Sequence, residues 1–156
     1  MTEPGLAARA AQIRRASARL CARLGWVPLH EVPLPNGRRA DILALRPDGG
    51  FACIEVKSGV RDFQTDGKWP EYWDFCDALF FAVDADFPRE MLPDQVGLIV
   101  ADGLEAELLR AVPDTRLTPP RRRALLHRFA QLAAGRLAAV DDPAGAAGLR
   151  AALRVD

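Results

Sequence analysis

The chain has 156 residues, of which 49% are hydrophobic and 27% charged, so we expect one soluble globular domain over residues 1–156 rather than a disordered chain. Lysine plus arginine and aspartate plus glutamate both number 21, and this zero net charge excludes a strongly basic nucleic-acid-binding domain. The three cysteines form no C-x-x-C pair, and we find no signal peptide and no apolar run long enough to span a membrane, so we expect a cytoplasmic protein.

The first half of the chain predicts one helix and three strands. Apolar residues recur at helical spacing over 5–24, and Gly25 follows as a stop signal. Strand-like segments follow at 26–34, 39–47 and 51–59, and the prolines of the first suit an edge strand. The turn signals NG and PDGG separate these segments, so they predict an antiparallel meander.

The second half predicts further helices and strands in alternation. Residues 58–69 are expected to form a polar loop, and 69–77 a helix with Pro70 in its first turn. Strands are predicted at 78–84 and 95–102, then a helix over 119–140 and a short final helix. Inward positions of the long helix are Leu125, Phe129, Leu132 and Leu137. This order of elements predicts an α/β fold in which helices flank a central mixed sheet.

The stretch FACIEVKSGV, residues 51–60, carries Glu55 and Lys57 near the end of an otherwise apolar strand. Glutamate and lysine side chains are rarely fully buried unless they are paired with an opposite charge or take part in the function of the protein. A four-residue turn before this strand would place Asp41 opposite Val56, and a three-residue turn would place it opposite Lys57. With either turn, Asp41, Glu55 and Lys57 converge at the rim of the sheet.

Two carboxylates this close repel each other unless a cation lies between them. Lys57 alone could form a structural ion pair with them. A hard divalent cation, with water and a substrate phosphate as its other ligands, would neutralise them better. This chemistry predicts Mg²⁺ or Mn²⁺ at Asp41, Glu55 and the Val56 carbonyl, with Lys57 assisting the hydrolysis of a phosphodiester.

Across most of the chain, and most specifically over residues 38–83, the sequence resembles the MmcB-like family of bacterial DNA repair proteins. The resemblance implies the restriction-endonuclease-like, PD-(D/E)XK fold: an αβββαβ core, followed here by a C-terminal strand and helix. It maps Asp41 and Glu55 onto the metal-binding acids and Lys57 onto the catalytic lysine. Many such nucleases add an acid from the first helix, which this chain lacks, so Glu31 or no residue takes that place.

Three functions follow as hypotheses. The first is a metal-dependent nuclease acting on DNA in repair, and the second is a non-catalytic DNA-binding or repair-complex adaptor that retains the nuclease fold. In the third, the charged cluster is only a structural ion pair. We expect DNA, other repair proteins and a second copy of the chain as partners, and no membrane. The residues expected to contact DNA are Arg38, Arg39, Arg61 and Lys68.

Two further groups of side chains have competing interpretations. Trp69, Tyr72 and Trp73 share one helix face, and such aromatic residues belong more often to a core than to a base-stacking platform. The run of arginines at 121–123 is either a solvated surface or a phosphate contact, and the solvated surface is the commoner case.

Overall fold

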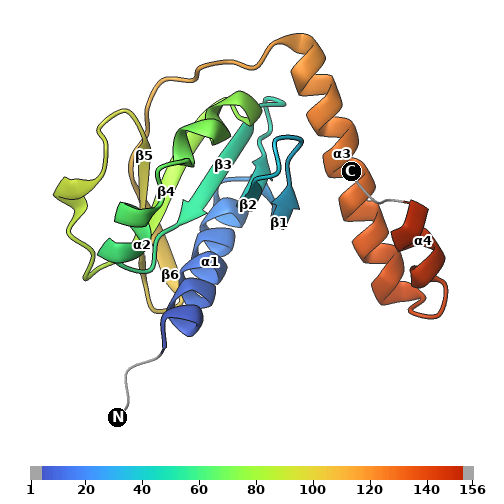
Figure 1. Ribbon diagram of the computed structural model, residues 1–156, viewed down its shortest axis with the longest axis horizontal. Helices are drawn as coiled ribbons and strands as arrows, with labels where there is room; N and C mark the ends of the chain where they lie inside the picture. Colours follow the sequence, from blue (N-terminus) through green and yellow to red (C-terminus); the bar gives the residue numbers. More distant parts are fainter. Residues whose placement is uncertain (1–4, 153–156) are drawn as a thin grey trace.

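The computed structural model of the chain describes residues 5–152, which fold around a six-stranded mixed sheet (Figure 1). The strands lie in the sheet in their sequence order, β1-β2-β3-β4-β5-β6. The pairs β1–β2, β2–β3 and β5–β6 are antiparallel, whereas β3–β4 and β4–β5 are parallel. The strands are β1 Val27–Pro33, β2 Arg39–Leu45, β3 Phe51–Val56, β4 Ala78–Asp84, β5 Gly97–Asp102 and β6 Glu105–Arg110.

Helices cover both faces of the sheet, and each face has its own hydrophobic core. One face packs against α1, while the other packs against α2, the 3₁₀ helix η1 and α3. α3 lies beside β1 and η1, and its C-terminal end extends past the sheet to α4 (Figure 1). No helix of residues 5–152 could cross a membrane. The helices are α1 Leu6–Arg23, α2 Val60–Thr65, η1 Trp69–Phe75, the 3₁₀ helix η2 Arg89–Met91, α3 Pro119–Asp141 and α4 Ala146–Ala152.

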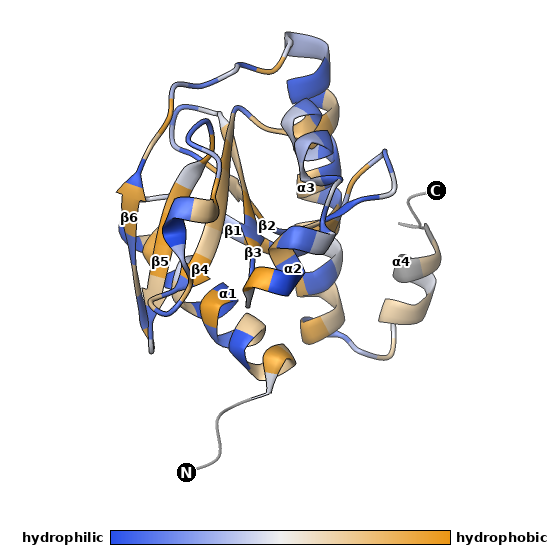
Figure 2. Cartoon of the chain, turned by 60° about the vertical axis from the view of Figure 1, so that its left-hand side comes forward, coloured by the Kyte–Doolittle hydropathy of each residue, from blue (hydrophilic) through white to orange (hydrophobic). Residues whose placement is uncertain are grey.

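The burial of the central strands explains their sequences. Every residue of β3 and all but the last residue of β4 are buried, because the two helical layers cover both faces (Figure 2). Strands in this position are expected to be continuous apolar runs. β1 lies at one edge of the sheet, where Pro28 and Pro33 cost little because an edge strand has one unpaired side.

Most of the predicted elements are confirmed, including the first helix, the antiparallel meander, the strands near 78–84 and 95–102, and the long C-terminal helix. The aromatic residues of η1 belong to the core, as the commoner interpretation predicted: Tyr72 is buried, and Trp69 and Trp73 pack against the same cluster. Leu137 was predicted to face inward, which is wrong. Its exposed fraction is 69%, because this end of α3 extends past the sheet.

Three elements were not predicted: β6, α2 and the single-turn 3₁₀ helix η2. β6 follows β5 through a tight turn in which Gly103 has a left-handed backbone, so the dipeptide Asp102–Gly103 was an overlooked hairpin signal. α2 lies within the segment expected to be a loop. It has only six residues, none of them buried, so it lacks the apolar periodicity that would have revealed it.

A buried carboxylate, Asp77, joins the sheet to α3. Its side chain is 1% exposed and accepts hydrogen bonds from the backbone N–H groups of Phe51 (2.7 Å) and Leu117 (2.9 Å). The guanidinium of Arg122 donates to both of its oxygens, at 2.6 and 2.8 Å. Burial by itself would raise the pKa of Asp77, but Arg122 and the two N–H groups hold it below its ordinary value.

The other members of the arginine run differ in their surroundings. Arg121 donates to the carbonyl of Asp74 and lies 3.6 Å from its carboxylate, with both side chains exposed. Arg123 is exposed. Arg122 therefore has a structural role, and the run is not a uniform phosphate-binding surface.

We predict that Asp77→Asn lowers the free energy of unfolding by about 3 kcal/mol or more, because it leaves buried donors and Arg122 without their anion. The depressed pKa means that this stabilisation is complete above about pH 4 and is lost as the pH falls through the folded-state pKa. Urea unfolding across pH 2–7 measures both effects. Asp74→Asn, which removes the exposed pair, is the matched control and should change little. Equal effects of the two substitutions would contradict the anchoring role.

Candidate active site

The turn between β2 and β3 sets which residues of the two strands lie opposite each other. The N–H of Arg46 donates to the carbonyl of Gly50, so residues 47–49 form the loop, and Gly49 has a left-handed backbone with φ 84°. The last paired residues are Ile42 and Ile54. One step further on, Asp41 is level with Glu55, so neither register predicted from the sequence is right. The glycine that closes the loop decides this register.

Beyond Ile42 and Ile54, side chains replace backbone groups as hydrogen-bond acceptors. The N–H of Val56 donates to Oδ2 of Asp41 at 2.8 Å, and the N–H of Asp41 donates to Oε1 of Glu55 at 3.1 Å. These two hydrogen bonds hold the carboxylates at the ends of adjacent strands. Within residues 5–152 neither carboxylate has a second hydrogen bond or an ion pair, which leaves one oxygen of each available to another ligand.

The electrostatics of this pair are unfavourable without a cation. Glu55 is 5% exposed, and burial, followed by repulsion from Asp41, raises its pKa to about 8. Burial also raises the pKa of Asp41, although the Val56 N–H and the charge of Lys57 oppose this. Hard divalent cations bind carboxylate oxygens and complete their coordination with water and substrate. The donor atoms of Asp41 and Glu55 therefore fit such an ion.

Lys57 is paired with a different acid. Its Nζ lies 2.6 Å from Oδ2 of Asp66, and the two side chains are 6% and 21% exposed. Burial alone would raise the pKa of Asp66. The pKa is nevertheless lowered, because Lys57 donates a hydrogen bond to the carboxylate and its positive charge stabilises the ionised form. The sequence contained no signal for this pair, because Asp66 is one of several polar residues in the segment between β3 and η1.

Residues 58–75, which we call the cover segment, lie over the sheet beside Glu55 and Lys57. Phe63 and Trp69 of this segment both contact the ring of Phe81 edge-on, with centroid distances of 5.5 and 5.3 Å. The hydroxyl of Tyr72 donates to the carbonyl of Arg39 at 3.0 Å. These contacts hold the cover segment against β4 and β2.

The third acid considered from the sequence is not part of the cluster. Glu31 is level with Asp41, since the flanking residues His30 and Val32 pair with Ile42 and Ala40. Its backbone is left-handed, with φ 49°, and its side chain is 55% exposed, with its carboxylate 4.0 Å from Arg39. Within residues 5–152 no three acidic, histidine or cysteine side chains form a metal-binding group.

The residues predicted to contact DNA lie on the segments that flank the acids. Arg38 forms an ion pair with Glu71 at 2.9 Å, and Arg39 is exposed two residues before Asp41. Arg61 is exposed on α2, and Lys68 is exposed just before η1. The backbone N–H of Lys68 donates to Asp66, so this residue also shapes the cover segment.

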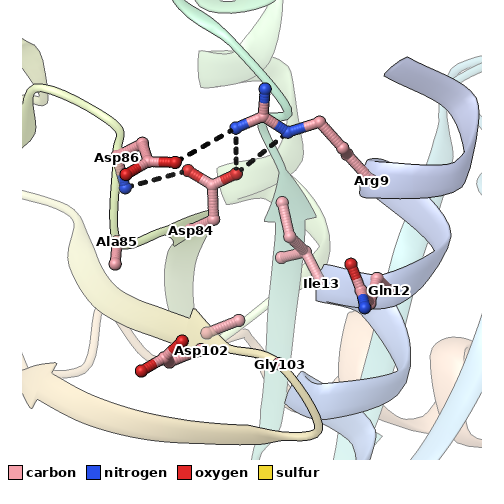
Figure 3. A pocket seen from close by; sticks show the side chains of 9 residues that line it. Arg9, Gln12, Ile13, Asp84, Ala85, Asp86, Asp102 and Gly103 are labelled. Carbon is pink, nitrogen blue, oxygen red and sulfur yellow. Dashed lines mark hydrogen bonds and ion pairs between the residues drawn. The ribbon is translucent and has the colours of Figure 1, made fainter. Parts of the chain in front are cut away.

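A separate hollow of about 270 Å³ lies at the carboxyl ends of β4 and β5 (Figure 3). Arg9 of α1 reaches into it and pairs with Asp84 at 2.6 Å and with Asp86 at 3.8 Å. The bond to Asp84 is partly buried and links α1 to β4. We assign this hollow a structural role, because its arginine fastens the helix to the sheet.

The antiparallel meander, the parallel β3–β4–β5 segment and the flanking helices define an α/β protein of the restriction-endonuclease-like class. The chain belongs to the MmcB-like family: the family model described as "DNA repair protein MmcB-like" matches residues 1–144. A solved structure, described as SPO1766 protein of unknown function from Silicibacter pomeroyi, has the same fold with a TM-score of 0.83. It is 42% identical, and the alignment covers 88% of this chain and 94% of that one. No curated protein matches the sequence.

The raised pKa of Glu55 predicts how metal-free stability depends on pH. Because the folded state holds the proton up to about pH 8 and the unfolded state releases it near pH 4.5, stability should fall as the pH rises between these values. Glu55→Gln keeps the acceptor for the Asp41 N–H and removes the titration, so its unfolding free energy should vary less over this range. Thermal and urea unfolding in chelator measure this difference. Glu107→Gln, on the exposed side of β6, is the control, and a Glu55→Gln profile parallel to that of the wild type would contradict the prediction.

Proposed function

We propose that this protein acts in DNA repair and hydrolyses phosphodiester bonds of DNA at the Asp41–Glu55–Lys57 site. The observation that carries the proposal is the placement of two carboxylates on adjacent strands, Glu55 buried and Asp41 partly buried, each with one oxygen available and neither paired with a cation. Family membership supports the role in repair. The resemblance of the motif to nuclease sites supports the reaction.

Each residue of the site has a distinct task in this proposal. Asp41 and Glu55 would hold Mg²⁺ or Mn²⁺, with the Val56 carbonyl as a third ligand. When bound, such an ion lowers the pKa of water and neutralises charge on the transferring phosphate. Lys57 would orient the attacking water or stabilise the negative charge that develops on the phosphate oxygens. The compact ammonium of lysine suits this task better than a forked guanidinium.

The cover segment has to move for this reaction to occur. Glu55 and Lys57 are each 5% exposed, and Lys57 is engaged by Asp66, so the ammonium cannot reach a phosphate in this conformation. Displacing Asp66 would release Lys57 and open the rim of the sheet. A phosphate is a suitable replacement partner for Lys57, because it offers the same charge-assisted hydrogen bond.

The same burial favours a second function. A chain whose acids and lysine stay covered would bind DNA or other repair proteins without cutting, and would serve as an adaptor that retains the nuclease fold. Arg38, Arg39, Arg61 and Lys68 would supply the DNA contact in either function. Because the net charge is zero, this contact should be local and sensitive to salt.

We predict that the protein binds Mn²⁺ at the two carboxylates. The Asp41→Asn/Glu55→Gln variant keeps both backbone hydrogen bonds but lacks the negative charges, so its affinity should fall by at least about tenfold. Isothermal titration calorimetry with Mn²⁺ measures this loss. An Asp84→Asn/Asp86→Asn variant, altered at the separate acidic hollow, is the control. Equal Mn²⁺ affinity of the wild type and the Asp41/Glu55 variant would rule out this metal site.

We predict that Lys57→Ala abolishes most DNA cleavage while leaving Mn²⁺ binding nearly unchanged, because the lysine acts on water or charge rather than on the ion. Lys57→Arg should also fail. Cleavage is measured with Mg²⁺ and with Mn²⁺ over single-stranded, nicked, flapped and branched DNAs. If Lys57→Ala cuts as well as the wild type, the reaction occurs elsewhere. If the wild type cuts none of these DNAs with either metal, the adaptor function replaces the nuclease.

A further inference from the structure

A hollow of about 540 Å³ lies between the β1–β2 turn and α3, and three arginines line it. Arg38 immediately precedes β2, Arg39 is the first residue of β2, and Arg128 comes from α3. Figure 2 shows α3 running alongside this end of the sheet, with hydrophilic residues along its first turns. We call this hollow the arginine pocket, and its lining residues are Pro33, Leu34, Pro35, Gly37, Arg38, Arg39 and Arg128.

Arg128 is a partly buried cation without an anion. Its guanidinium donates to the carbonyl of Pro33 at 3.2 Å, and within residues 5–152 no carboxylate lies within ion-pair distance of it. Burial alone lowers its pKa, with no acidic neighbour to oppose the effect. Two other partly buried arginines of this fold each have an acid: Arg122 has Asp77, and Arg46 has Asp114. An unpaired cation in such a position is costly unless a ligand supplies the charge.

The other two arginines of the pocket keep donors available. Arg38 pairs with Glu71 through its Nε. Arg39 is 66% exposed, and its ion pair with the carboxylate of Glu31 is long, at 4.0 Å. A guanidinium has five N–H donors, so one long or single contact leaves most of them unused. Three guanidinium groups that converge on one hollow form a site for a phosphate group.

The arginine pocket is linked to the candidate active site through β2, because Arg39 lines the pocket and Asp41 lies on the same strand. Arg39 lies two residues before Asp41 on β2, so their side chains project from the same face of the strand, about 7 Å apart along it. The hydroxyl of Tyr72 fixes the Arg39 carbonyl between the two. A nucleic-acid strand with one phosphate at Asp41 would therefore carry a neighbouring phosphate to the mouth of the pocket.

We propose that the arginine pocket binds a backbone phosphate of the DNA strand that lies across the Asp41–Glu55 site, with Arg128 as its principal ligand. This inference rests on DNA being the partner in the proposed function, but it does not require cleavage. The prolines at 33 and 35 add an apolar wall, which suits the sugar of a nucleotide better than a free, fully hydrated phosphate ion. Inorganic phosphate shares the same chemistry and is distinguished in the test.

The test compares two arginines of α3 that make the same kind of contact with β1. Arg128 donates to the Pro33 carbonyl and lines the pocket. Arg136, two helical turns further on, donates to the carbonyls of His30 and Glu31 outside the pocket. Arg128→Gln and Arg136→Gln remove one positive charge each and retain a donor. Fluorescence anisotropy with a labelled oligonucleotide, in chelator so that nothing is cut, measures DNA affinity across a range of salt concentrations.

We expect Arg128→Gln to weaken DNA binding about tenfold and to reduce the slope of log affinity against log salt by about one, as the loss of one phosphate contact requires. Arg136→Gln should change the affinity by less than about twofold, and melting temperatures measured alongside confirm that both variants fold. Equal affinities of the two variants, or no DNA binding by the wild type, would overturn the proposal.

Competition distinguishes the two sources of phosphate. If millimolar inorganic phosphate binds the wild type but not Arg128→Gln, and DNA binding is the same in both, the pocket takes a free phosphate compound and the strand assignment fails. Weaker DNA binding by Arg128→Gln supports the pocket even if the wild type cuts no DNA. The pocket and the nuclease activity are thus tested separately.

Discussion

The buried carboxylate of Asp77 is the interaction on which the arrangement of the remaining parts depends. It accepts hydrogen bonds from β3, from the segment before α3 and from Arg122 of α3, which are 26, 40 and 45 residues away in sequence. The backbone of the same residue bonds to Phe51 and Thr115. One side chain thereby fixes where α3 begins relative to the sheet. Arg128 lies six residues after Arg122 on the same helix, so its position follows from that anchor.

The acidic side chains at Asp77 and at the Asp41–Glu55 pair have opposite electrostatic surroundings. At Asp77 every oxygen is saturated by donors, and a guanidinium supplies the opposite charge. At Asp41 and Glu55 each carboxylate has one backbone donor and no ion pair, and burial disfavours ionisation. The first arrangement stabilises the fold. The second costs stability unless a cation is supplied, which is typical of a binding site rather than a structural one.

The sequence was most informative where one physical requirement dominated. The apolar runs of β3 and β4 follow from burial on both faces, and the convergence of Asp41 with Glu55 follows from alternation along paired strands. The exact register depended on the left-handed conformation of Gly49, which the residues PDGG permit but do not require. The pairing of Lys57 with Asp66 depends on packing of Phe63 and Trp69 against Phe81, and no local pattern encodes contacts between such distant residues.

The weak internal structure of α2 has a consequence for access to the site. This helix has six residues, none of them fully buried, so little free energy holds it beyond the ring contacts of its own Phe63 with Phe81 and Phe87. Its amides should exchange with solvent through local opening, whereas those of β3 and β4 should exchange only on unfolding of the whole sheet. Access of a ligand to the site then depends on local opening of α2. A substitution in α2 can change the rate of this opening without changing the global stability of the protein.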